Sequence, residues 1–133
     1  MTDLVFHRLL WLYVALTVAS TIASAFPQHS ATLQAAAVAE PTSWLLEMAW
    51  FWAGVFPALM GTWLVGLVGL FRFRSWGRTL SLWSTMAALL IYPFIGSSLY
   101  WGVETALSDA CSLVWGGILA LAYFSPVSAR FER

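Results

Sequence analysis

The acidic residues are the first group in this chain that could perform chemistry. Four of the six acids are Glu40, Glu47, Glu104 and Asp109; the last three border long apolar stretches, and Glu40 lies in the loop before Glu47. If these acids face the same side of a membrane, they could bind a cation or relay protons. Glu47 and Asp109 also stand near expected helix starts, where a carboxylate favours the positive end of the helix dipole. We expect this capping role first, with an outer acidic site as the alternative.

An arginine-rich segment is the second candidate site. Arg72, Arg74 and Arg78 lie close together, with Phe73 and Trp76 between them. Such a cluster could hold an anionic lipid headgroup or a phosphate group. Arginines at the ends of membrane helices also determine orientation, and we expect that role to explain most of the cluster.

The tryptophans could form a third kind of site. The chain has nine of them, and five lie near expected membrane surfaces, where indoles anchor a helix. The other four lie deeper, at Trp50, Trp52, Trp63 and Trp115. These four could line an aromatic ligand pocket, although packing against lipid or other helices is the expected role.

Other chemistry finds no support in the sequence. The lone Cys111 has no partner for an intramolecular disulfide, and no Cys/His cluster with metal-ligand spacing is present. Phosphate-binding glycine loops, nucleophile elbows and long basic tracts are also missing. The sequence therefore predicts a protein that is not an enzyme, with no cofactor, no metal and no nucleic-acid partner.

The elements that carry these residues are four long uncharged stretches. The chain has 133 residues, of which 61 % are hydrophobic and only 9 % are charged, whereas a soluble domain has about 25 %. Each stretch has about 20 residues or more, enough for a helix to cross the bilayer core. The sequence predicts an all-α integral membrane protein with one domain, a four-transmembrane-helix antiparallel bundle. The helices are expected at about 5–26, 44–71, 79–100 and 106–124.

The arginines orient this bundle. All six basic residues are arginines, and they fall at the two termini and between the second and third stretches. Both termini are therefore expected in the cytoplasm of a bacterial inner membrane. The outer loop 27–43 could carry a short surface helix from Ser30. In an alternative interpretation, the small residues at 23–25 form the cleavage site of a secretory signal.

Small residues are expected to mediate helix packing, because they let helix backbones approach closely in lipid. The expected packing positions are Ser112, Gly116, Gly117, Ala120, Gly54 and Gly61. Gly66 and Gly69 continue the series of small residues along the second stretch. Pro57 and Pro93 should kink the second and third helices.

These features together favour a non-enzymatic accessory subunit. Its partners would be the lipid bilayer and another membrane protein or a second copy of itself, contacted through the small residues. The first alternative is a small transporter, channel or ligand-binding protein with an outward-facing acidic and aromatic site. A membrane immunity or lysis factor is the second alternative.

Overall fold

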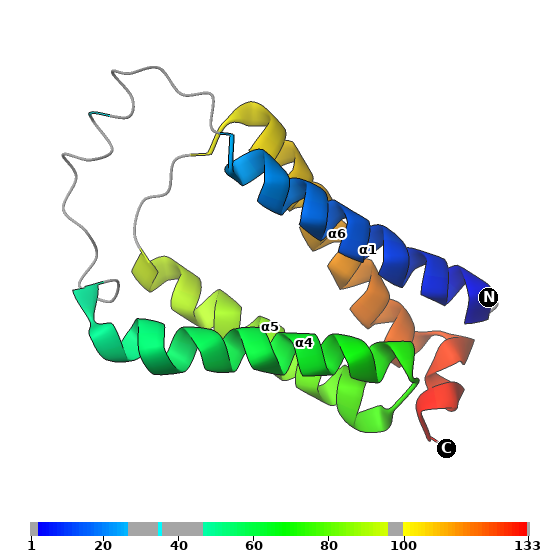
Figure 1. Ribbon diagram of the computed structural model, residues 1–133. Helices are drawn as coiled ribbons and strands as arrows, with labels where there is room; N and C mark the ends of the chain where they lie inside the picture. Colours follow the sequence, from blue (N-terminus) through cyan, green and yellow to red (C-terminus); the bar gives the residue numbers. More distant parts are fainter. Residues whose placement is uncertain (1–2, 27–34, 36–46, 96–99, 133) are drawn as a thin grey trace. The chain divides into compact units, whose positions relative to one another are not determined.

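The computed structural model of the protein describes residues 3–26, 35, 47–95 and 100–132 (Figure 1). Most of these residues are helical and none of them forms a strand, which confirms the all-α prediction. Three helices are long and apolar enough to cross a membrane: Asp3–Ser24, Phe51–Phe71 and Gly102–Phe124. Helix α5 (Ser75–Ile95) is of similar length but is not among these three, so a bundle of four membrane helices is not confirmed.

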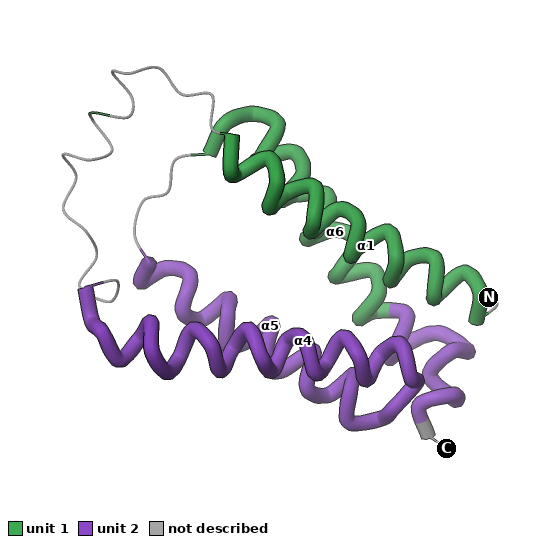
Figure 2. The backbone as a smooth tube through the Cα atoms, viewed as in Figure 1, with its two compact units in different colours: residues 1–41, 98–120 green, residues 42–97, 121–133 purple. Residues whose placement is uncertain are grey.

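The chain divides into two compact units (Figure 2). Unit 1 comprises Met1–Pro41 and Ser98–Ala120, and unit 2 comprises Thr42–Ser97 and Leu121–Arg133. Helix α6 (Gly102–Phe124) begins in unit 1 and ends in unit 2. The expected surface helix in the outer loop lies outside the described residues, except for residue 35.

Unit 1 pairs helix α1 (Asp3–Ser24) with the first part of α6 (Figure 1). The ring of Tyr13 on α1 stacks on that of Trp115, with centroids 4.6 Å apart. Further along, the Trp101 indole Nε1 donates a hydrogen bond to the Ala23 carbonyl at 3.4 Å. Tyr13 precedes Ala23 in the chain, whereas its partner Trp115 follows Trp101, so the two segments run antiparallel.

A short π-helical segment precedes α4 (Phe56–Phe71) in unit 2. The π-helix η1 (Phe51–Val55) leads directly into α4. Pro57 follows at the start of α4 and has no N–H to donate, and its ring would crowd the carbonyl four residues earlier. A local change to π-helical hydrogen bonding accommodates a proline of this kind, and the Phe56 N–H bonds to the Phe51 carbonyl instead.

A tight turn joins α4 to α5. The Arg74 N–H donates to the Gly69 carbonyl at 2.9 Å, and the Phe73 N–H donates to the Leu70 carbonyl at 3.1 Å. This pair of bonds is the Schellman motif, which satisfies carbonyls at the end of a helix. The motif needs a left-handed residue, which is usually glycine, but here Phe73 adopts it with φ of 50°.

Helices α4 and α5 touch through their backbones. A Cβ added to Gly69 would lie 2.5 Å from the Cα of Gly77, and one added to Gly77 would collide with the carbonyl carbon of Gly69. One turn further from the loop, a Cβ on Gly66 would lie 2.6 Å from the Ser81 hydroxyl. These positions accept only glycine, because any side chain would force the helices apart.

The chain ends in a short 3₁₀-helix, η2 (Pro126–Glu132), which the sequence did not predict. The Ser125 hydroxyl donates to the Leu121 carbonyl at 2.6 Å and accepts the Val127 N–H at 3.2 Å. One side chain thus caps both the end of α6 and the start of η2. Val127 and Phe131 of η2 are buried.

Candidate functional site

Arg78 on α5 contacts both the end of α6 and two aromatic rings within unit 2. Its guanidinium Nη1 donates to the Ala122 carbonyl in the last turn of α6 at 3.5 Å. Carbonyls there have no partner within the helix and carry the negative end of its dipole. The guanidinium carbon also lies 5.1 Å from the Tyr123 ring centroid and 5.8 Å from that of Phe131, within reach of cation–π attraction.

Phe131 connects this arginine to the turn. Its ring, fully buried, meets the Phe73 ring edge-on at 5.3 Å between centroids. Phe73 is the residue held in the left-handed conformation of the turn. We call Phe73, Arg78, Tyr123 and Phe131 the arginine–aromatic cluster. It ties three segments of unit 2 together: the α4–α5 turn, the end of α6 and η2.

The other two arginines of the turn differ from Arg78. Arg72 and Arg74 are exposed, and among the described residues neither makes an ion pair with a carboxylate. The chain has no acidic residue between Glu47 and Glu104. Of the three arginines predicted to bind headgroups, Arg78 contacts its own chain, while Arg72 and Arg74 present their charges to the surroundings.

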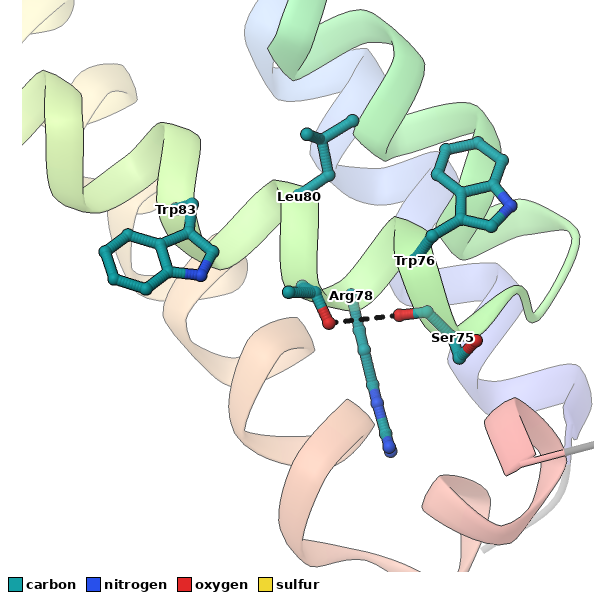
Figure 3. A pocket seen from close by; sticks show the side chains of 6 residues that line it. Ser75, Trp76, Arg78, Leu80 and Trp83 are labelled. Carbon is teal, nitrogen blue, oxygen red and sulfur yellow. Dashed lines mark hydrogen bonds between the residues drawn. The ribbon is translucent and has the colours of Figure 1, made fainter.

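A shallow depression of about 420 Å³ lies on α5 just after the turn (Figure 3). We call it the α5 groove; its lining consists of Ser75, Trp76, Arg78, Thr79, Leu80 and Trp83. Trp76, Leu80 and Trp83 are four and three residues apart and share one face of the helix. The Arg78 side chain extends away from Leu80 (Figure 3). Only the part of this side chain near the helix lines the groove, and the guanidinium lies in the arginine–aromatic cluster.

The predicted outer acids are separated between the two units. Glu47 is exposed in unit 2, whereas Glu104 and Asp109 lie on the unit 1 part of α6. Glu40 is outside the described residues. Within residues 3–26, 47–95 and 100–132, no group of three or more His, Cys, Asp or Glu side chains could hold a metal ion. The shared acidic site therefore remains a prediction.

The predicted packing residues are all exposed in the described chain: Ser112, Gly116, Gly117, Ala120, Gly54 and Gly61. At the four glycines, an added Cβ would meet no described atom within 4 Å. Within the described chain, close backbone packing occurs at Gly66, Gly69 and Gly77, and the role of the other small residues stays a prediction. A signal for these positions was present in the sequence, because Gly69 and Gly77 are almost equidistant from the turn and must face each other in an antiparallel pair.

The four deep tryptophans do not line the α5 groove. Trp115 is buried against Tyr13 in unit 1, whereas Trp50 and Trp52 are exposed in unit 2. Trp63 is half-buried on α4. The tryptophans of the groove, Trp76 and Trp83, belong to the group that the sequence assigned to the membrane surface.

No family model, no curated protein and no solved structure matches this chain.

Proposed function

We propose that this protein is an integral membrane protein of the bacterial inner membrane, with four spans and both termini in the cytoplasm. In that membrane it is a non-enzymatic accessory subunit that packs against another membrane protein or a second copy of itself. The observation that carries the proposal is the exposure of its apolar helices. Only 17 %, 22 % and 22 % of the most apolar windows of the three candidate spans is buried.

The exposed side chains are large as well as numerous. Leu113, Leu90 and Trp83 are 78 %, 72 % and 68 % exposed. Exposed apolar surface on this scale is unfavourable in water by about 25 cal/mol for each Å². Lipid or a partner helix removes that cost, and the arrangement along whole helices favours lipid.

Helix α5 is proposed as the fourth span because the two serines near its middle are buried. Ser81 and Ser84 are 0 % and 6 % exposed. The Ser84 and Thr85 hydroxyls both donate to the Ser81 carbonyl, at 3.0 and 2.8 Å. The surface that α5 offers to lipid is therefore more apolar than its sequence average, and a polar group bonded within the helix is tolerated in a bilayer.

The exposed small residues support the accessory role. Ser112, Gly116 and Ala120 recur every four residues along α6 and share one face. Space is open above Gly116, so a helix from another subunit could approach the backbone closely. An ion-coupled transporter usually needs a charged side chain near the middle of a span. Among the described residues, α4 has no charged side chain, and those of α1 and α6 lie within the first eight residues of each helix.

Membrane placement is tested by cysteine labelling in a Cys111→Ser background. Gly102→Cys places a thiol where an added Cβ meets nothing within 4 Å, and Ser75→Cys places one at the exposed start of α5. In intact cells, an impermeant thiol reagent should label the first variant and not the second. Labelling of Ser75→Cys from outside would contradict the proposed orientation.

The accessory role is tested by association in mild detergent. Gly116→Leu should abolish co-purification of a defined partner, or of a differently tagged second copy. Val103→Leu, at an exposed position of the same helix, should leave it intact. Equal recovery with both variants would contradict contact through this face of α6.

A further inference from the structure

We propose that the α5 groove, together with Arg72 and Arg74 in the turn that precedes it, is a binding site for an anionic phospholipid. The phosphate-bearing headgroup would lie at the arginines, and an acyl chain would run along the groove past Trp83. The inference rests on the membrane placement proposed above and adds a ligand to it.

Charge identifies the sign of the ligand. Arg72 and Arg74 are exposed and make no ion pair among the described residues. No acid occurs from residue 48 to residue 103, so α4, α5 and the turn between them contribute no carboxylate to neutralise the two charges. Arg78 is directed to the Ala122 carbonyl and the aromatic rings. An anion near the turn therefore interacts chiefly with Arg72 and Arg74.

The groove offers both the polar and the apolar contacts that a phospholipid needs. The end beside the turn combines a polar residue, Ser75, with an indole, Trp76, and the far end is apolar, with Leu80 and Trp83. Ser75 and Trp83 are separated by about 12 Å of helix at 1.5 Å per residue. That length accommodates a headgroup beside the turn and the upper part of an acyl chain beyond it.

The same features favour a lipid over a small soluble anion. Trp76 and Trp83 are 47 % and 68 % exposed, and an acyl chain would cover both indoles. The Trp76 ring lies against Gly69, since a Cβ on that glycine would be 2.9 Å from Cζ3 of the indole. Free phosphate would use the arginines and leave this apolar wall uncovered.

The test uses vesicles of phosphatidylcholine and phosphatidylglycerol containing the full chain. Bromine atoms on the acyl chains of one lipid quench the fluorescence of tryptophans that they touch. Brominated phosphatidylglycerol, which is anionic, should quench more strongly than brominated phosphatidylcholine at equal mole fraction. In Trp83→Phe, the difference between the two lipids should shrink to the part contributed by Trp76.

Charge variants identify the residues that give this preference. One arginine near an anionic surface contributes about 1 kcal/mol, or roughly a fivefold change in binding. Arg74→Gln should therefore lower the preference for phosphatidylglycerol about fivefold, and Arg72→Gln/Arg74→Gln should lower it further. Arg8→Gln is the matched control, because it removes an exposed arginine from the other unit and should leave the preference unchanged. Arg72→Lys/Arg74→Lys should retain it.

The outcomes separate this inference from the proposed function. Equal quenching by the two lipids would overturn the lipid site and leave the membrane placement standing. No quenching by either lipid would overturn both. An equal loss in Arg8→Gln and Arg74→Gln would show general surface attraction and overturn the site. Loss of the preference on adding inorganic phosphate would assign the arginines to a soluble anion instead.

Discussion

The two antiparallel helix pairs are held together by different parts of the chain. In unit 2, α4 and α5 approach until the backbones of Gly69 and Gly77 touch. In unit 1, α1 and α6 are joined by large side chains, through the stacked rings of Tyr13 and Trp115. The glycines of α6, Gly116 and Gly117, have no described atom above them.

This difference shows which contacts can adjust. Two glycines in backbone contact have no side chain that could change rotamer. Any substitution adds atoms between α4 and α5 and must increase the distance between the two helices. A pair of stacked rings can tilt or change rotamer, and its loss leaves space that neighbours can partly fill. We therefore expect substitutions to affect unit 2 more strongly, and the following predictions test that expectation.

The largest effect is expected from Gly77→Leu. Its side chain would enter the backbone of α4 at Gly69, and the helices would have to separate. The loss of unfolding free energy should reach or exceed the roughly 3 kcal/mol that overpacking commonly costs. Denaturant titration in detergent measures it. Gly61→Leu is the control on α4, because a Cβ there meets nothing within 4 Å; equal losses in both variants would contradict the close contact.

The next effect is expected from Phe131→Ala, which removes a fully buried ring from the arginine–aromatic cluster. Truncation of a buried phenylalanine costs about 3 kcal/mol or more. We expect a loss near that value, with faster protease cleavage after η2 is released. Phe124→Ala provides the comparison, since Phe124 is 92 % exposed and its truncation should leave stability and cleavage unchanged. A stable, protease-resistant Phe131→Ala protein would refute the role of the cluster.

A smaller effect is expected in unit 1. The Tyr13–Trp115 stack should show a coupling free energy of about 1 kcal/mol in a double-mutant cycle, as aromatic pairs do. The cycle compares Tyr13→Ala, Trp115→Ala and the double variant by thermal unfolding in detergent. Additive losses from the two single changes would mean that the stack does not hold the pair together.

The smallest effect tests the turn. Phe73 has φ of 50°, and a left-handed conformation costs a non-glycine residue about 1 kcal/mol. Once Phe131→Ala has removed the ring that contacts Phe73, Phe73→Gly should stabilise the protein by up to that amount. In the native background the same change also loses an aromatic contact, so it should give no gain. Stabilisation in both backgrounds would show that the contact with Phe131 contributes nothing.

The helices were predictable because long apolar stretches interrupted by charge allow few other structures. The helix expected at about 106–124 is observed at Gly102–Phe124, and the one expected at about 5–26 at Asp3–Ser24. The 3₁₀-helix η2 could not be found in this way. It is too short for periodicity, and it depends on the Ser125 bonds and on burial of Phe131, which are tertiary features.

The site was predictable only as a set of charges. Counting arginines located the cluster at 72–78 but could not distinguish Arg78 from Arg72 and Arg74. The distinction depends on the end of α6 and on η2, which lie more than 40 residues later in the chain. Gly66 and Gly69 were named among the small residues of the second stretch, but their partner position Gly77 was missed for a related reason. Spacing along one helix identifies small residues, while contact also requires the matching position on the partner helix.

The backbone contact between α4 and α5 has a consequence for insertion of the chain into the membrane during synthesis. If the chain spans the membrane as proposed, α5 presents a problem during synthesis, because it is not among the helices apolar enough to cross alone. Ser81 is covered once Gly66 lies against it. The two helices, separated by a three-residue turn, would then enter the bilayer together as a preformed hairpin. Contact with α4 would lower the cost of inserting α5.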